Sequence, residues 1–186
     1  MKFTQEKYAK DLLKKFNMQA CRPVATSIES NQKLTKEMAP QSENETNEMN
    51  GKPYRELIGG LLYLANSTRP DLAFAASVLS CFCSNPGIVH WKMAKSLLRY
   101  IQATVNYGLN YEECDQKLCA HVDSDWAGDI DGRKSSSGNM IILANKPISW
   151  ESRKQKSVAV STMKAEPYRR NQGSHPYEKD AKKNGI

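Results

Sequence analysis

Two aspartates set two residues apart are the strongest candidates for chemistry in this sequence. Asp123 and Asp125 end a stretch in which Leu118, Ala120 and Val122 occupy every second position. A period of two is typical of a half-buried strand, so both carboxylates would share one face. An acidic pair there lowers stability unless a cation or a basic group neutralises it, so one interpretation is a functional site. A second interpretation stays open, that both aspartates point into water beside a turn rich in Asp and Gly.

Short strands separated by polar turns would hold this pair in place. They are expected over residues 107–111, 118–125, 139–143 and 148–151. The last three are joined closely, which favours an antiparallel meander. Beyond them we expect an extended stretch at residues 157–161 and the start of a helix that reaches Glu166.

The upstream half has the apolar spacing of helices. Four are expected, over residues 4–16, 53–66, 71–82 and 89–104. Thr4 and Asp71 are the expected N-caps of the first and third of these. Opposite the apolar side of the last helix runs a basic stripe, formed by Lys92, Lys95 and Arg99. The pattern leaves open whether this stripe follows a nucleic-acid backbone or only keeps the protein soluble.

Two segments lack any apolar period. Residues 27–52 are polar and carry five Glu against three Lys, so we expect a flexible linker. Residues 169–186 are polar and basic, and a disordered tail is expected there. The predicted fold class is therefore α+β, with about four helices followed by a three-stranded antiparallel meander and the start of one helix.

Composition narrows the class of protein. With 39% hydrophobic and 25% charged residues the chain is expected to be soluble and globular. A net charge of +7 favours a polyanionic partner, nucleic acid first, although a basic surface also serves solubility. The five cysteines match no zinc spacing and are expected to be reduced and mostly buried. The N-terminus lacks a signal peptide's apolar core, so we expect an intracellular protein, cytoplasmic or nuclear, without a membrane span.

Four short motifs follow one another in the second half of the sequence. They are Asp123-Ser-Asp-Trp-Ala-Gly-Asp129, Arg133-Lys-Ser-Ser-Ser-Gly138, Ile148-Ser-Trp150, and Val158-Ala-Val-Ser161 followed by Ala165-Glu166. In order and spacing they resemble the ribonuclease H domain of copia-type retrotransposon Pol polyproteins. Upstream, Tyr54-Arg-Glu-Leu-Ile-Gly59, Thr68-Arg-Pro-Asp71 and Leu97-Leu-Arg-Tyr100 look like the segment that joins reverse transcriptase to that domain.

The resemblance implies a nuclease that cuts the RNA strand of an RNA/DNA hybrid with two divalent cations. Mg²⁺ or Mn²⁺ would be held by carboxylates, since hard cations prefer oxygen ligands. By position, Asp123 and Glu166 would be the catalytic, metal-binding residues. The expected nucleic-acid contacts are Lys92, Lys95, Arg99, Arg133 and Lys134. The implied partners are an RNA/DNA hybrid or other nucleic acid and the remainder of the Pol polyprotein.

The resemblance also divides the chain into five segments. They are the helical end of reverse transcriptase (1–26), a flexible linker (27–52), a helical connection segment (53–106), a partial ribonuclease H-like domain (107–168) and a disordered tail (169–186).

The chain also departs from this pattern. Lys164 replaces an acidic residue and Pro167 an aromatic one, and residues 169–186 contain no counterpart of the later carboxylate motifs. We therefore expect a truncated domain with an open edge on strand 118–125, poor Mg²⁺ binding and no activity by itself. The alternative is a non-enzymatic protein, derived from the element, that binds nucleic acid or a host partner. A third interpretation is a ribonuclease H completed by another chain.

Overall fold

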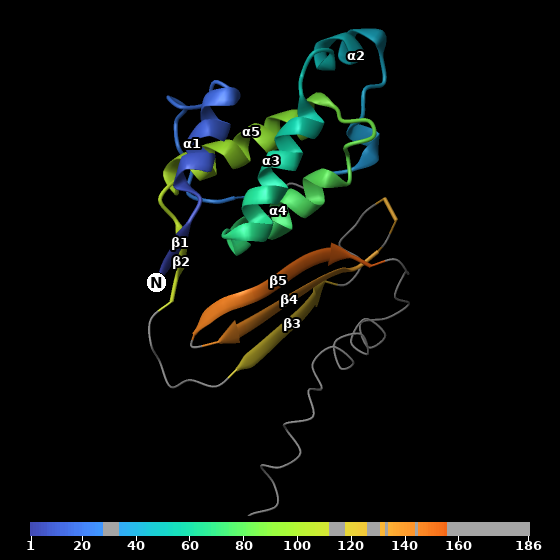
Figure 1. Cartoon of the computed structure of the whole chain (residues 1–186). Coiled ribbons are helices and arrows are strands. Elements are labelled where there is room, and N and C mark those ends of the chain that lie inside the picture. Colours follow the sequence, from blue (N-terminus) through green and yellow to red (C-terminus); the bar gives the residue numbers. More distant parts are fainter. Residues whose placement is uncertain (28–33, 112–117, 126–130, 133, 144, 156–186) are drawn as a thin grey trace, which may run out of the picture.

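The computed structural model describes residues 1–27, 34–111, 118–125, 131–132, 134–143 and 145–155, and leaves out the side chains of residues 124 and 125. In these residues a layer of helices covers one face of a three-stranded sheet, and a two-stranded sheet lies at one end (Figure 1). The α+β prediction is confirmed. The elements are β1 (Lys2–Thr4), α1 (Glu6–Lys15), η1 (Lys36–Met38), α2 (Glu43–Met49), α3 (Tyr54–Ser67), α4 (Pro70–Ser80), α5 (Ile88–Ala103), β2 (Gly108–Asn110), β3 (Cys119–Asp125), β4 (Ser136–Leu143) and β5 (Lys146–Lys154).

The core lies between α1, α3, α4 and α5, the four helices that the apolar spacing predicted. Leu57, Leu61, Leu72 and Leu97 are fully buried there, and each stabilises the fold by about 2 kcal/mol through burial. Gly60 lets α1 approach α3 closely, because a Cβ at this position would lie 2.6 Å from a methyl group of Leu12. No helix in the described part of the chain has the length and apolar character needed to cross a membrane.

Both predicted N-caps were wrong by one or two residues. α1 is capped at Gln5, and Thr4 ends β1 while its Oγ1 accepts a hydrogen bond from the Glu6 amide. α4 is capped at Arg69, with Pro70 in the first helical position. Proline favours that position because its fixed φ suits a helix and it has no N–H to leave unpaired. Asp71 is therefore inside the first turn of α4.

Within the segment expected to be a flexible linker, residues 36–38 and 43–49 form short helices, and its flexibility stays a prediction. Ser42 caps α2 by accepting a hydrogen bond from the Glu45 amide. Before η1, Leu34 is buried, and the Thr35 carbonyl oxygen accepts a hydrogen bond from the buried His90. This hydrogen bond joins residues that are 55 positions apart in the chain, so local composition could not predict it.

The expected strand near residue 108 has a partner that the sequence did not indicate. β2 pairs antiparallel with β1, and the N-terminal amine of Met1 donates a 2.6 Å hydrogen bond to the Tyr111 carbonyl oxygen. The start of α1 is thereby held beside the chain that leaves α5. A strand of three residues is too short to produce a visible alternating pattern.

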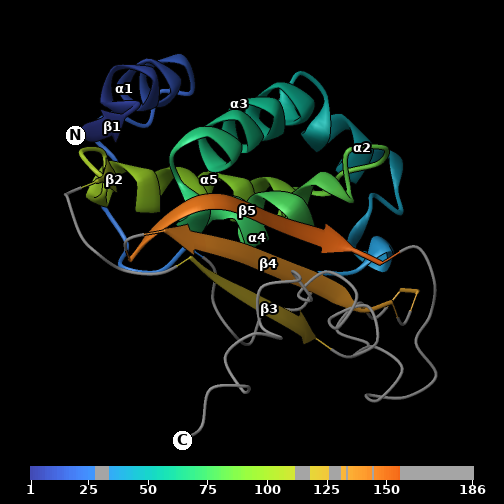
Figure 2. The same cartoon turned by 60° about the horizontal axis from the view of Figure 1, so that its bottom comes forward.

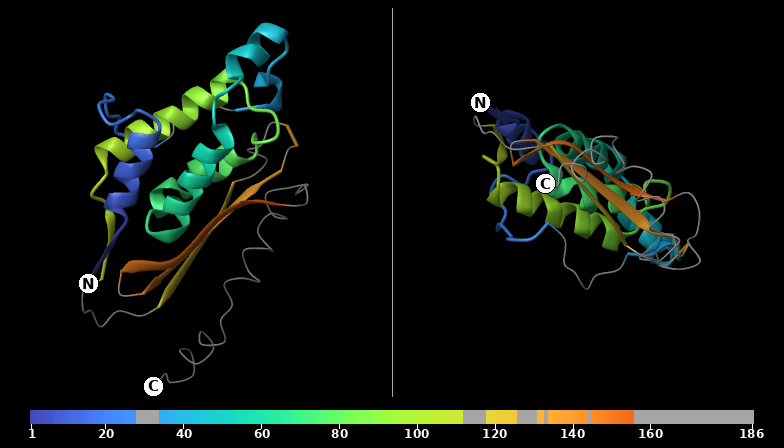
Figure 3. Two further views of the ribbon diagram at one scale, coloured as in Figure 1. Left: turned by 45° about the horizontal axis from the view of Figure 1, so that its top comes forward. Right: turned by 90° about the horizontal axis from the view of Figure 1, so that it is seen from below.

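The three-stranded meander forms as predicted. Its order is β3-β4-β5, and both pairs are antiparallel. β3 lies at an edge among the described strands, as expected. Figures 2 and 3 show the sheet and the helices as two layers, with α4 against β5.

Several predictions concern residues outside the described part of the chain. These are the extended stretch at 157–161, the helix start at Glu166, the side chain of Arg133 and the tail at 169–186. Four of the cysteines are described, and all four are free thiols. The expectation that most of the thiols are buried was wrong for these four, because Cys21 and Cys83 are half-buried and Cys81 and Cys119 are exposed.

Candidate functional site

The candidate metal ligand Asp123 lies in β3, opposite Gly138 of β4. Its side chain is exposed, and it borders a cleft of about 540 Å³ between α4 and the sheet. Glycine at the opposite position leaves room beside the carboxylate, because a Cβ at Gly138 would meet only the Glu151 carbonyl oxygen, at 3.9 Å. The predicted strand position of Asp123 is confirmed, whereas its metal-binding role stays a prediction.

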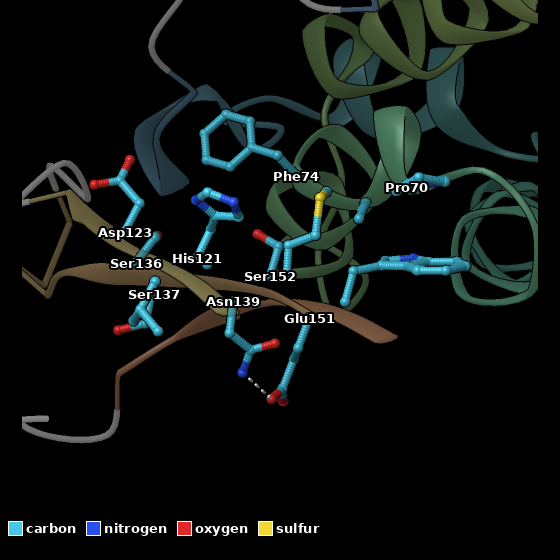
Figure 4. A pocket seen from close by; sticks show the side chains of 14 residues that line it. Pro70, Phe74, His121, Asp123, Ser136, Ser137, Asn139, Glu151 and Ser152 are labelled. Atoms are coloured by element: carbon cyan, nitrogen blue, oxygen red, sulfur yellow. Dashed lines mark hydrogen bonds between the residues drawn. The ribbon is translucent and has the colours of Figure 1, made fainter. Parts of the chain in front are cut away.

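The cleft has a polar end and an apolar end. Met140 lies opposite both His121 and Trp150 in the sheet register, so these three share one face of the sheet. Figure 4 shows His121 on the side of the sheet where Phe74 of α4 lies, while Asn139 and Glu151 point away. Asp123, Ser136 and Ser152 line the polar end.

The described part of the chain supplies one of the two predicted metal ligands. Glu166 lies outside the described residues, and so does the side chain of Asp125. In the described ranges, no group of three or more His, Cys, Asp or Glu residues could hold a metal ion. The structure therefore places Asp123 at a cleft but does not test its pairing with Glu166.

The predicted nucleic-acid contacts fall on two elements. Lys92, Lys95 and Arg99 lie on α5, where Lys92 is exposed and the other two are half-buried. Lys134 is half-buried in the connection before β4. The stripe on α5 is thus confirmed as a helical face, whereas Arg133 lies outside the described residues.

A buried arginine at the start of α4 was not predicted from the sequence. Arg69 is 2% exposed, and its guanidinium forms a salt bridge with Asp71, 2.8 Å from Nη2 to Oδ2. It also donates to the carbonyl oxygen and to Oγ1 of Thr104, at 3.0 and 2.7 Å. The Tyr100 hydroxyl donates to Asp71, and the pKa of Tyr100 is raised, first by burial and then by this carboxylate. The Thr68-Arg-Pro-Asp71 motif therefore holds the start of α4 against the end of α5 through these hydrogen bonds.

A buried histidine was missed as well. His90 is fully buried, and its ring stacks on Phe82 with the centroids 4.1 Å apart. Nδ1 accepts a hydrogen bond from the Gly87 amide, so the neutral ring donates from Nε2 to the Thr35 carbonyl oxygen. Burial lowers the pKa of His90, and the hydrogen bond to Thr35 and the charge of Asp131 oppose that shift. His90 therefore has a structural role, since both ring nitrogens are engaged.

Comparison with known proteins shows which sequences this chain resembles. The chain is 42% identical over 163 residues to the retrovirus-related Pol polyprotein from transposon TNT 1-94 of Nicotiana tabacum. It is 38% identical over 164 residues to the retrovirus-related Pol polyprotein from transposon RE2 of Arabidopsis thaliana. Both alignments cover 88% of this chain, and they span 12% and 11% of those polyproteins.

A shorter relative matches across most of its own length. Secreted RxLR effector protein 161 of Plasmopara viticola is 44% identical over 119 residues, which are 63% of this chain and 84% of that protein. The chain belongs to the same sequence family as these transposon Pol polyproteins and this effector. It corresponds to a segment of a transposon Pol polyprotein. No family model matches the chain, and no solved structure matches it.

Proposed function

We propose that this chain is a segment of a copia-type Pol polyprotein that joins the end of reverse transcriptase to the first half of a ribonuclease H domain. In the polyprotein, that domain cleaves the RNA strand of RNA/DNA hybrids by two-metal hydrolysis during reverse transcription. The observation that carries the proposal is the position of Asp123, on the first strand of an antiparallel meander and at the cleft under α4. The identity to transposon Pol polyproteins supports it.

The implied cofactor, Mg²⁺ or Mn²⁺, can be compared with the described residues. Asp123 offers the hard oxygen donor that such cations prefer. Two cations about 4 Å apart require several carboxylates between them, and the described ranges hold no group of three suitable ligands. The described residues alone therefore do not fit a two-metal site. In our proposal Glu166 supplies one further ligand and the remainder of the polyprotein supplies the others.

We propose accordingly that the 186-residue chain does not cleave hybrids by itself. This proposal is supported by the sequence of residues 169–186, which contains no counterpart of the later carboxylate motifs of a ribonuclease H domain. A site with too few ligands positions its cations poorly, and this chemistry depends on position.

Cleavage of a labelled RNA/DNA hybrid in Mg²⁺ or Mn²⁺ tests both proposals. The chain alone should leave the hybrid intact. A fusion to the C-terminal half of a homologous ribonuclease H domain should cleave it, and Asp123→Asn should abolish that cleavage. Glu151→Gln, which removes the same charge from a side chain pointing away from the cleft, is the control for an altered charge on the sheet. Cleavage by the chain alone that disappears in Asp123→Asn would refute the proposed inactivity.

A second candidate function is non-enzymatic binding of nucleic acid or of a host partner. The exposed Lys92 on the basic side of α5 favours it, and so does a relative named as a secreted effector. Binding that persists in Asp123→Asn, without cleavage in any fusion, is the result expected for this function.

A further inference from the structure

The net charge of the chain is concentrated in two segments that are distant in sequence. Residues 1–26 and 88–106 together contain nine basic and two acidic residues, which equals the whole net charge of +7. The remaining residues balance, with eighteen of each sign. A charge asymmetry of this size indicates a surface for a polyanion.

The fold places these two segments side by side. The ring of Phe16, at the end of α1, lies 6.4 Å from that of Trp91 at the start of α5. Further along α5, Arg99 Nε donates a 2.7 Å hydrogen bond to the Arg22 carbonyl oxygen, and the Val24 amide donates to the carbonyl oxygen of Arg99. The backbone after α1 thus runs beside the basic stripe, and Arg22 is the exposed basic residue of that segment. We call Arg22, Lys92, Lys95 and Arg99 together the basic face.

Among the described residues, no salt bridge neutralises the cations of the basic face. None of its four residues forms a salt bridge with another residue of the described ranges, whereas Lys10 and Lys15 pair with Glu6 and Glu56. The Arg99 guanidinium is also held in place through Nε, which leaves its other N–H groups for a ligand. An arginine fixed before binding loses less conformational entropy when it binds.

The spacing along α5 suits a nucleic-acid backbone. Lys92 and Arg99 are separated by seven residues, or about 10 Å along a helix, a length over which a duplex presents about six phosphate charges. A helix that lies in a membrane surface needs apolar side chains beside its basic ones. On α5 the apolar side chains of Met93, Leu97, Leu98 and Ile101 are buried in the core instead.

We propose that the basic face binds the phosphate backbone of nucleic acid, without reading base sequence. The inference rests on the proposed function in taking nucleic acid as the polyanion. Its test needs no cleavage, because all binding is measured in the presence of a chelator, so failure of one proposal leaves the other standing. Arg22 is a contact that the spacing of residues on α5 could not reveal.

Salt-dependent binding to a labelled RNA/DNA hybrid and to duplex DNA provides the test. The triple variant Arg22→Gln, Lys92→Gln, Lys95→Gln should lower the slope of log affinity against log salt by about 2.7, or about 0.9 for each lost phosphate contact. Arg99 is kept because it holds the loop at Arg22. Two hybrids of unrelated sequence should bind the intact chain equally.

A matched control removes the same charge from residues already paired with glutamates. It is the triple variant Lys10→Gln, Lys15→Gln, Arg153→Gln. This variant should keep a slope within about one unit of the intact chain. Equal losses in both triple variants would refute the proposal, because net charge alone would then explain binding. Loss of binding to phosphatidylserine vesicles, with hybrid binding unchanged, would instead identify a membrane surface and also refute it.

Discussion

Trp150 of β5 donates a hydrogen bond from its indole Nε1 to the Ala65 carbonyl oxygen of α3, over 2.7 Å. Ala65 lies in the last turn of α3, where carbonyl oxygens lack partners within the helix. The sheet thus supplies a partner for the end of α3, and the bond joins the two layers that form the cleft at Asp123.

Replacing Trp150 with Phe tests this link between the layers. The variant keeps an aromatic ring but loses the donor, so we expect a loss of about 1–2 kcal/mol in the free energy of unfolding. Urea denaturation measures it. Trp91→Phe is the control, because the described contact of Trp91 is with the ring of Phe16. A larger loss in Trp91→Phe than in Trp150→Phe would contradict the assignment.

Arg69 should be the most costly charged residue to remove from the helical layer. Arg69→Ala leaves the Thr104 carbonyl oxygen without this donor and the Asp71 carboxylate with only the Tyr100 hydroxyl, so we expect a loss of about 3 kcal/mol. Arg55→Ala is the matched control, since exposed Arg55 makes a single hydrogen bond, to the Cys83 carbonyl oxygen. That variant should cost about 1 kcal/mol or less. Similar losses in Arg69→Ala and Arg55→Ala would mean that the buried contacts of Arg69 do not hold α4 to α5.

Acid should weaken the fold through His90. Burial lowers its pKa below the usual 6.5, so the unfolded chain takes up the proton first as the pH falls. Neutral His90 therefore contributes its full stabilisation to the fold above pH 6.5. This stabilisation is lost as the pH falls from 6.5 toward the lowered pKa of His90 in the folded state.

Urea denaturation between pH 7.5 and pH 5 gives the slope of the free energy of unfolding against pH. His90→Gln should flatten it, whereas His121→Gln, at an exposed position, should leave it unchanged. An unaltered slope in His90→Gln would show that other groups cause the acid sensitivity.

Replacement of Gly87 and of Gly59 with alanine should change the stability of the fold in opposite directions. A Cβ at Gly87 would lie 1.9 Å from the Met38 carbonyl oxygen, so Gly87→Ala should displace the segment around η1 and cost about 2 kcal/mol or more. Gly59, inside α3, has nothing within 4 Å of that position, and Gly59→Ala should stabilise the helix by about 0.5–1 kcal/mol.

Thermal unfolding compares the two glycine variants, and hydrogen exchange at Met38 and Ala39 reports whether the segment has moved. Their amides form the hydrogen bonds of η1 in the intact chain. Gly87→Ala with unchanged stability and exchange would disprove the close contact between η1 and the start of α5.

Local pattern was sufficient for the elements that repeat a short period. Each of the four helices was predicted from its own apolar residues, and the meander from the alternation before Asp123 and the short turns between strands. An element that buries one face repeats apolar residues with its own period, and an element buried all round is a continuous apolar run. The motifs around Asp123 also carried the resemblance to Pol polyproteins that the comparisons support.

Only the tertiary structure decided the contacts between residues far apart in the chain. Arg69 with Thr104, His90 with Thr35 and Arg22 with Arg99 join segments 35, 55 and 77 residues apart. A single hydrogen bond of this kind leaves no period in the sequence, because either partner is also common on a solvated surface. The helical turn η1 and the basic face that Arg22 forms with the stripe on α5 therefore became visible only once the helices were packed.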